Sequence, residues 1–265
     1  MQKDIETLFG HLWDNYIQVT PSAHKVHQLL GGGAAIVNDH VAFRTFNLPQ
    51  VGLETLAAHF RALGYEERDE YVFKAKKLYA KHFEHADPDA PKVFISELKV
   101  EELSDAAQAI IYKLVAQVPT HLTDTSAFLY AGAPWQVSGA DYQTLLAESE
   151  YAAWMAAWGY RANHFTVSIN RLADFDTIQL VNEALKAAGF VLNTAGGEVK
   201  GDPQVMLEQS STMADKADVA FTDGVRTIPS CFYEFALRYP QANGVLYPGF
   251  VEASADKIFE STNSM

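Results

Sequence analysis

The sequence predicts an α+β fold made of two paired β-α-β-β-β modules, with a helix before the first module and a helical insert between the two. The modules cover about residues 36–100 and 161–240, the insert covers residues 101–160, and all of them belong to a single domain over residues 1–265. Hydrophobic patterns follow the same order in both modules: a strand, an amphipathic helix that ends at a glycine, and three further strands. This repetition is the main observation behind the fold prediction.

Two likenesses between the modules support the repeat. The first strand of each module carries a histidine near its start, His40 in one and His164 in the other. The last strands read VFISEL and CFYEFA, and each places a glutamate, Glu97 or Glu234, among apolar residues. The repeat is one of pattern, since the two modules share little identity.

The elements of the first half follow from periodicity. Helical spacing of apolar residues predicts a helix over residues 2–19, which Thr20-Pro21 ends. Residues 20–28 and the glycine triplet after them are expected to form a flexible lead-in and a turn, because no strand precedes the glycines and no Gly-Lys-Ser/Thr follows them. The first module then contains a strand at 39–46, a helix at 51–63 and strands at 70–73, 77–85 and 93–99.

The second half repeats this order after the insert. Apolar spacing predicts an insert helix at 103–115, and a second helical zone, rich in tyrosine, tryptophan and alanine, is expected at about 141–158. The second module is expected to contain a strand at 163–170, a helix at 175–188 and strands at 205–209, 219–222 and 230–238.

Composition excludes several classes of function. A formal net charge of −13 argues against a nucleic-acid surface, which needs clustered lysine and arginine. No apolar run approaches the roughly 20 residues of a membrane span, and the early residues show no basic segment followed by the apolar run of a signal peptide. The single cysteine, Cys231, excludes an internal disulfide and is expected to be a buried thiol. We therefore expect a cytoplasmic protein without nucleic-acid or membrane partners, either a monomer or a homodimer.

Three residues on three predicted strands form a candidate metal site. Pairing of the modules would bring the two first strands side by side and place His40 and His164 within reach of one metal, with Glu234 as the third ligand. Two imidazoles and one carboxylate hold iron(II), Fe(2+), and leave positions open for substrate and oxygen, although three-ligand zinc sites are chemically possible too. The alternatives are two structural histidines, and a Glu234 neutralised by Arg44 or Arg238. Glu97 is the rival ligand, with more polar flanks.

A second group of polar residues is a candidate substrate site. Arg44 lies on the same strand face as His40, because side chains alternate along a strand, and its guanidinium could hold a carboxylate with two hydrogen bonds. Gln209 and Ser211 could add polar contacts, or could serve only the hydrogen bonding of a strand end. The other histidines, among them His82, are expected at the surface.

Four motifs resemble the DUF1338 family: HVAFR from His40, NHFT around His164, EQSSTMAD from residue 208, and PSCFYEF around Glu234. The characterised members of that family are 2-oxoadipate dioxygenase/decarboxylases, iron(II) enzymes of lysine catabolism that form 2-hydroxyglutarate. The family is similar to the vicinal oxygen chelate superfamily, and its mechanism resembles that of hydroxymandelate synthase. The resemblance implies metal ligation by His40, His164 and Glu234, and substrate-carboxylate binding by Arg44 as a catalytic residue.

The predicted activity is therefore the iron(II)-dependent conversion of 2-oxoadipate, or a similar 2-oxo acid, and dioxygen to 2-hydroxyglutarate and carbon dioxide. A glyoxalase-like metal-dependent lyase or isomerase, in which Glu234 would alternate between ligand and base, is the alternative on the same scaffold. A metal-free module that binds a small carboxylate is the non-enzymatic alternative.

Overall fold

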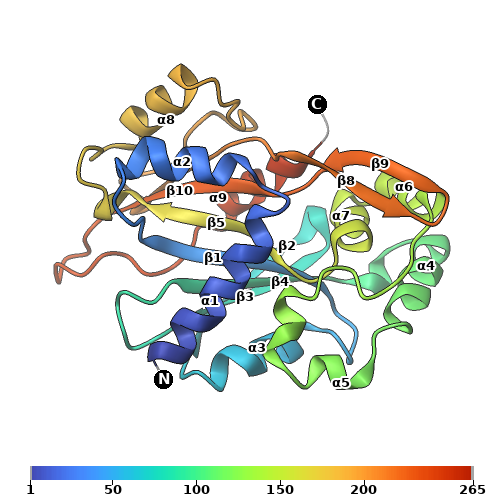
Figure 1. Ribbon diagram of the computed structural model, residues 1–265. Helices are drawn as coiled ribbons and strands as arrows, with labels where there is room; N and C mark the ends of the chain where they lie inside the picture. Colours follow the sequence, from blue (N-terminus) through green and yellow to red (C-terminus); the bar gives the residue numbers. More distant parts are fainter. Residues whose placement is uncertain (1, 264–265) are drawn as a thin grey trace.

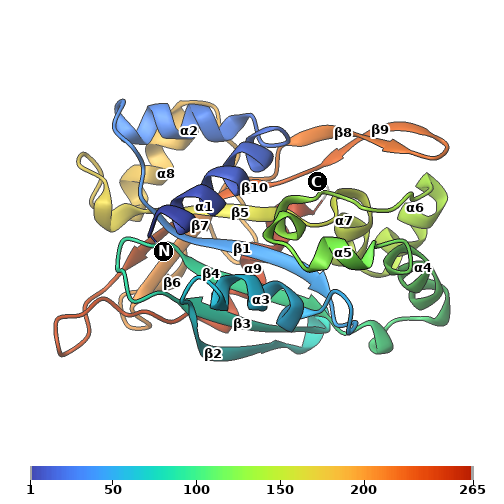
Figure 2. The same ribbon diagram turned by 60° about the horizontal axis from the view of Figure 1, so that its bottom comes forward.

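The computed structural model describes residues 2–263, and its centre is one curled sheet with the strand order β2-β3-β4-β1-β5-β10-β7-β6 (Figures 1 and 2). Strands β1 and β5 are antiparallel neighbours in the middle, with β4 parallel to β1 and β10 parallel to β5. The strand order is thus the same on either side of the middle pair. This arrangement confirms the predicted α+β fold of paired β-α-β-β-β modules.

Each half of the sheet is one module in chain order. The first module contains β1 (Asn38–Phe46), α3 (Leu53–Arg61), β2 (Glu66–Phe73), β3 (Leu78–Glu84) and β4 (Lys92–Leu98). The second contains β5 (Ala162–Ser168), α8 (Ile178–Ala187), β6 (Lys200–Asp202), β7 (Leu207–Ser211) and β10 (Phe232–Arg238).

Two predicted elements differ from the structure. Residues 20–28 are not a flexible lead-in, because α2 (Ser22–Gly31) buries Ala23, Val26 and Leu30 along one side. The strand expected at residues 219–222 does not join the main sheet. It belongs to β8 (Lys216–Phe221), which pairs only with β9 (Gly224–Pro229), and the short β6 takes its place in the module. Alternating hydrophobicity indicates a strand but does not identify the strand that it pairs with.

Alternation along the central strands divides the sheet into a helix-covered face and a site face. On the first face the Phe43 ring lies 5.4 Å from that of Phe60 in α3, and the Phe165 ring lies 5.0 Å from that of Tyr16 in α1 (Gln2–Ile17). Residues one position along the same strands point to the other face. His40 and His164 are among them.

The helical insert lies at one end of the sheet, next to the β8–β9 hairpin (Figures 1 and 2). It contains η2 (Val100–Glu102), α4 (Asp105–Val115), α5 (Thr120–Thr123), η3 (Ser126–Tyr130), α6 (Gly139–Glu148) and α7 (Glu150–Trp158). Helix α7 is apolar almost all round and is buried, as expected for a helix enclosed on every side. The indoles of Trp154 and Trp158 donate hydrogen bonds to the carbonyl oxygens of Ser230 and Pro229 and so fasten α7 to the end of β9.

The end of the chain covers the site face of the sheet. Helix α9 (Glu252–Ile258) packs against β2, β6 and β7. The 3-10 turn η5 (Phe259–Thr262) follows it and contacts β2 through Phe259 and β7 through Ser261. No element is predicted for this segment from the sequence alone. Two further 3-10 turns, η1 (Lys74–Lys76) and η4 (Ile169–Arg171), follow β2 and β5.

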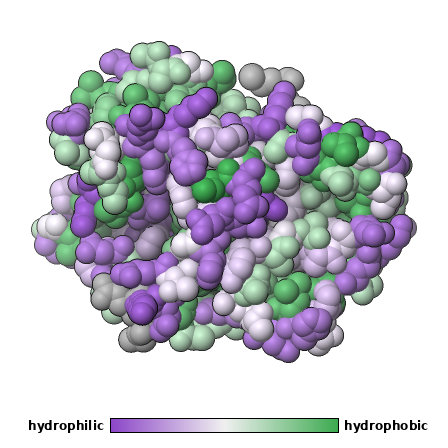
Figure 3. All heavy atoms as spheres, in the orientation of Figure 1, coloured by the Kyte–Doolittle hydropathy of each residue, from purple (hydrophilic) through white to green (hydrophobic). Residues whose placement is uncertain are grey.

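The outer surface is mixed in character. On the face seen in Figure 3, hydrophilic residues predominate and hydrophobic residues form small, separated patches. No helix within residues 2–263 is long and apolar enough to cross a membrane.

Candidate metal site

Strand register brings His40, His164 and Glu234 together on the site face. In the pairing of β1 with β5, Thr166 lies opposite His40, and in the pairing of β5 with β10, Thr166 lies opposite Glu234. The Oε2 atom of Glu234 lies 2.9 Å from Nε2 of His164 and 3.6 Å from Nε2 of His40. One candidate ligand atom from each residue lies within 4.8 Å of the other two, and all three side chains are buried.

Two β-bulges aim the histidines. The register between β1 and β5 shifts between Asn38 and His40, which leaves Asp39 unpaired, and shifts again where Asn163 is the extra residue of β5. Each bulged side chain reaches the Nδ1 atom of the histidine that follows it, with Asp39 Oδ1 at 2.8 Å from His40 and Asn163 Oδ1 at 2.9 Å from His164. Such contacts fix the tautomer and leave each Nε2 atom for a metal.

The donor set fits a divalent metal ion. Two neutral imidazoles and a carboxylate on one side of a cavity form the facial arrangement that mononuclear non-haem iron sites use, and the same set accepts zinc and other divalent ions. The separations of the Nε2 and Oε2 atoms are close to those of neighbouring ligands around one ion with bonds of about 2.1 Å. The hydroxyl of Thr166 also lies 3.1 Å from His40 Nε2 and would have to turn when that nitrogen binds a metal.

The protonation states of the three residues are coupled. Burial raises the pKa of the Glu234 carboxyl, but the imidazoles of His40 and His164 outweigh it and hold that pKa at about 2. Burial lowers the pKa of His164, whereas the pKa of His40 is raised, because Glu234 and Asp39 outweigh the effect of its burial. The raised pKa of His40 favours its protonation beside the Glu234 carboxylate, and a metal cation would compete with that proton.

The cavity beside the triad is small and largely apolar. Its volume is about 20 Å³, enough for about one water molecule. The amide of Gln209 donates a 2.5 Å hydrogen bond to Glu234 Oε1 from one wall. The other lining residues are Phe94, Phe250, Ala255, Ile258 and Phe259. Ala255 and Ile258 belong to α9 and Phe259 belongs to η5, so this segment near the end of the chain closes the site.

The geometry decides between the partners considered for Glu234. Among the described residues no arginine or lysine lies within 4.0 Å of its carboxylate, so the salt-bridge alternative is wrong. Arg238 instead pairs with Asp39, with Nε to Oδ2 at 2.7 Å. The rival ligand Glu97 accepts a hydrogen bond from the backbone N–H of Leu53 at the start of α3 and lies outside the triad.

Arg44 lies on the site face but does not line the cavity. Its side chain is 1% exposed. Its Nη1 atom lies 3.2 Å from Oε1 of Glu150 in α7, and Nη2 donates a 2.9 Å hydrogen bond to the Thr262 hydroxyl in η5. The guanidinium lies 4.8–5.8 Å from the ring centres of Tyr151, Trp154 and Phe259.

The structure agrees with some of the predictions for the remaining polar residues and differs from others. Gln209 lines the cavity, whereas the Ser211 hydroxyl lies 2.8 Å from that of Ser261 in η5. The prediction that His82 is at the surface is wrong, since its ring is fully buried between the Tyr71 hydroxyl and Phe250. Asn163 has no distinguishing feature in the sequence beyond its place before a ligand histidine. Cys231 is buried, as expected.

Fold and site together define an α+β protein of the vicinal oxygen chelate type with one buried His-His-Glu site able to hold a metal ion. The same fold occurs in a glyoxalase superfamily protein from Ralstonia eutropha JMP134, at a TM-score of 0.74 and 23% identity over 93% of this chain and 85% of that one. A family model described as 2-oxoadipate dioxygenase/decarboxylase matches residues 3–129 and 127–243, and the chain belongs to this family.

Individual relatives and solved structures match the chain over most of its length. The chloroplastic/amyloplastic 2-oxoadipate dioxygenase/decarboxylase of Oryza sativa subsp. japonica is 37% identical over 97% of this chain and 78% of its own length. A crystal structure of hydroxyglutarate synthase from Oryza sativa in complex with 2-oxoadipate has a TM-score of 0.89 and 37% identity, covering 97% of this chain and 91% of that one. A Shewanella frigidimarina NCIMB 400 protein described as a hydrolase has a TM-score of 0.91 and 63% identity, covering 94% and 98%.

Proposed function

We propose that the protein is an iron(II)-dependent dioxygenase/decarboxylase that converts 2-oxoadipate and dioxygen to 2-hydroxyglutarate and carbon dioxide. The observation that carries the proposal is the buried triad of His40, His164 and Glu234 in a member of the 2-oxoadipate dioxygenase/decarboxylase family. The rice relative with 2-oxoadipate bound supports the choice of substrate. When bound, iron(II) would supply a site for dioxygen beside a chelating 2-oxo acid.

The residues around the triad prepare it for this chemistry. Asp39 and Asn163 hold the two imidazoles in position, and Gln209 holds one oxygen of Glu234, so the ligands need little rearrangement on binding a metal. Apolar residues such as Phe250, whose ring centre lies 4.8 Å from that of His40, keep bulk water away. A dry site limits side reactions of activated oxygen.

Arg44 is the proposed binder of the second carboxylate of the substrate. It lies four residues from His40 on the same strand, so about 13 Å separates their Cα atoms, a distance that the arginine side chain and a six-carbon diacid can span together. Its Nε atom is buried and has no hydrogen-bond partner within residues 2–263. A charged donor without an acceptor in a buried site is suited to a carboxylate. Gln209 and Ser211 are proposed as further polar contacts of the substrate.

The closed cavity implies that η5 and α9 move when substrate binds. About 20 Å³ beside the triad cannot hold a six-carbon diacid. Phe259 lies both in this cavity and over the Arg44 guanidinium, so displacement of its ring would join the two.

Oxygen consumption tests the proposed reaction. Protein purified without oxygen and loaded with iron(II) should consume oxygen with 2-oxoadipate and release one carbon dioxide for each 2-hydroxyglutarate formed. Arg44→Lys keeps the charge but loses the planar fork, and it should raise KM by about 10–100-fold while leaving the iron content unchanged. Loss of iron from that variant would show that Arg44 supports the metal site instead. Iron-loaded protein that consumes no oxygen with any 2-oxo acid would refute the dioxygenase and favour the lyase or isomerase.

The pathway, the cellular location and the oligomeric state are also proposals. We infer a role in lysine catabolism, a cytoplasmic location, and a monomeric or homodimeric state. The single buried cysteine is consistent with a reducing compartment.

A further inference from the structure

The ion pair between Arg44 and Glu150 has unusual geometry. Both Glu150 oxygens lie 3.2 Å from the same nitrogen, Nη1 of Arg44, whereas a strong guanidinium–carboxylate pair has two parallel bonds of about 2.7–2.9 Å. The Nη2 atom donates to Thr262, and Nε has no hydrogen-bond partner among the residues that the structure describes. Glu150 therefore neutralises the guanidinium charge but leaves much of its hydrogen-bonding capacity unused.

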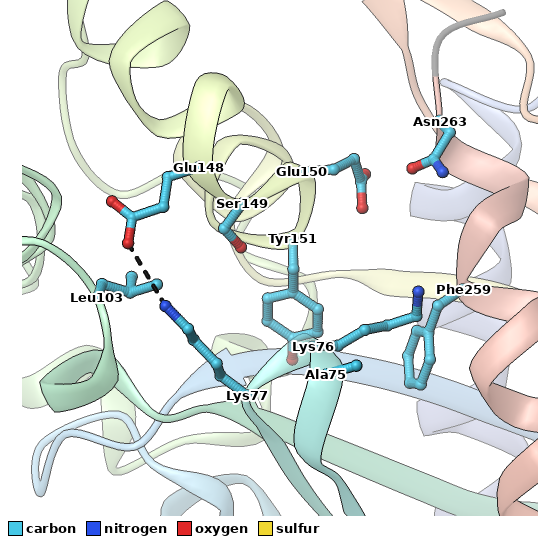
Figure 4. Close-up of a pocket in the computed structure, with 10 residues that line it drawn as sticks. All are labelled: Ala75, Lys76, Lys77, Leu103, Glu148, Ser149, Glu150, Tyr151, Phe259 and Asn263. Atoms are coloured by element: carbon cyan, nitrogen blue, oxygen red, sulfur yellow. Dashed lines mark ion pairs between the residues drawn. The ribbon is translucent and has the colours of Figure 1, made fainter.

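Among the described residues that contact the Arg44 guanidinium, Glu150 is the most exposed to solvent. Its side chain is 23% exposed, whereas that of Arg44 is 1% exposed and Thr262 is 2% exposed. Glu150 lines an outer pocket of about 180 Å³, together with Lys76, Lys77 and others (Figure 4). In the close-up, its carboxylate lies at the start of α7 and points toward the side of the pocket formed by η5.

The outer pocket and the metal cavity share one wall. Phe259 lines both spaces, and its ring centre lies 5.8 Å from the Arg44 guanidinium. A ligand that enters from the outer pocket and displaces this ring therefore meets Arg44 before it meets the triad. Glu150 lines the outer pocket and contacts Arg44, so it lies beside this path.

We propose that the Glu150 carboxylate occupies the place at Arg44 that the far carboxylate of the substrate takes, so that Glu150 is an internal competitor that substrate must displace. This inference rests on the proposed function, because that function supplies a dicarboxylate. The released Glu150 side chain would turn into the outer pocket, toward water and the ammonium groups of Lys76 and Lys77. Monocarboxylic 2-oxo acids have no second carboxylate to exchange for Glu150, and the same residue thus favours diacids.

Binding measurements with matched variants test this exchange. Glu150→Gln keeps the size of the side chain and removes its charge, and Glu150→Asp keeps the charge but withdraws it by one methylene group. Glu148→Gln is the control for long-range charge, because it removes one acid from the same pocket while its own partners are Ser104 and Lys77. The ligands are 2-oxoadipate and glutarate, titrated calorimetrically without oxygen into metal-loaded protein.

We expect Glu150→Gln to bind both diacids about tenfold more tightly than the unsubstituted protein, and Glu150→Asp to show a smaller gain in the same direction. Glu148→Gln should change either affinity by less than about twofold. Unchanged or weaker binding in both Glu150 variants would overturn the inference and would identify Glu150 as a residue that positions Arg44. Glu150→Asp keeps this conclusion accessible if Glu150→Gln does not fold.

These measurements distinguish a failure of the proposed reaction from a failure of the proposed exchange at Arg44. Glutarate has no 2-oxo group, so tighter glutarate binding by the Glu150 variants supports the exchange at Arg44 even if 2-oxoadipate causes no oxygen uptake. Conversely, oxygen uptake by the unsubstituted protein together with weaker diacid binding by both variants supports the reaction and refutes the exchange.

Discussion

Asp39→Asn separates the two roles of the carboxylate behind His40. Asp39 is buried and accepts hydrogen bonds from His40 Nδ1 at 2.8 Å and from Arg238 Nε and Nη2 at 2.7 and 2.8 Å. The asparagine can still accept from His40 through its amide oxygen. It cannot neutralise Arg238, whose side chain is 4% exposed, and its NH₂ group faces a second donor.

The size of the effect follows from these contacts. Breaking a buried ion pair by removing one charge costs about 3–5 kcal/mol. Arg238 keeps hydrogen bonds to the carbonyl oxygens of Tyr247 and Gly249, which places the expected loss near the lower end, about 3 kcal/mol in the free energy of unfolding. Metal affinity should fall by only about tenfold, because outer partners of metal-bound histidines contribute about 10–100-fold and the imidazole keeps an acceptor.

Asn163→Ala is the matched comparison in the other module. It removes the acceptor from His164 Nδ1 without stranding a charge, so metal affinity should fall by up to about 100-fold while stability falls by about 1 kcal/mol. Competition with a metal-binding dye measures the metal affinity, and urea unfolding of metal-free protein measures the stability. A stable Asp39→Asn protein that loses metal more severely than Asn163→Ala would refute this division of roles.

Three further predictions concern the triad, the helix-covered face and the chain end. Glu234→Gln should lower metal affinity by roughly 100-fold or more and abolish the metal-dependent rise in Tm, and an unchanged rise would exclude Glu234 as a ligand. Burial, and less strongly His24, lowers the pKa of His27 to about 4, so the folded protein keeps this ring neutral while the unfolded chain protonates it near pH 6.5. The contribution of the neutral ring to stability should therefore be fully present above pH 6.5. The free energy of unfolding should fall by about 1–2 kcal/mol, after a discount for partial exposure, as the pH falls toward 4. His27→Gln should flatten this pH dependence in urea unfolding, and an equally steep dependence would show that His27 is not its source. Phe250→Ala should lower the free energy of unfolding by about 3–5 kcal/mol, because the ring packs on His40, Phe94 and Tyr71, and a loss below about 1 kcal/mol would show that the chain end is not firmly packed there.

The bulges give the site a symmetry that the ligands alone do not show. Each ligand histidine follows a bulged residue whose side chain holds its Nδ1 atom, yet one module uses Asp39 with Arg238 and the other uses the neutral Asn163. Arg238 thus neutralises the Asp39 carboxylate, which contacts the metal site only through His40. Glu234 is the one negatively charged residue among the three proposed ligands. A divalent ion with one anionic ligand keeps a net positive charge that attracts an anionic substrate.

Local stereochemistry made the framework predictable from the sequence. Alternation along a strand places His40 and Arg44 on one face without reference to the rest of the chain. The repeated order of strands and helices then predicts that the first strands pair, which brings His164 to His40. An isolated carboxylate among apolar residues needs a partner when buried, and this requirement makes Glu234 a candidate ligand.

Tertiary packing decided what surrounds the framework. Glu150 reaches Arg44 across 106 positions in sequence, and Thr262 does so across 218. The closing segment formed by α9 and η5 has no distinctive pattern of its own, and only its docking on β2, β6 and β7 places Phe259 between the metal cavity and the outer pocket. Periodicity reports which side of an element is buried, because that depends on the local geometry of the chain. The identity of the covering partner depends on contacts distant in sequence, and here those contacts determine how the candidate site opens and what competes for it.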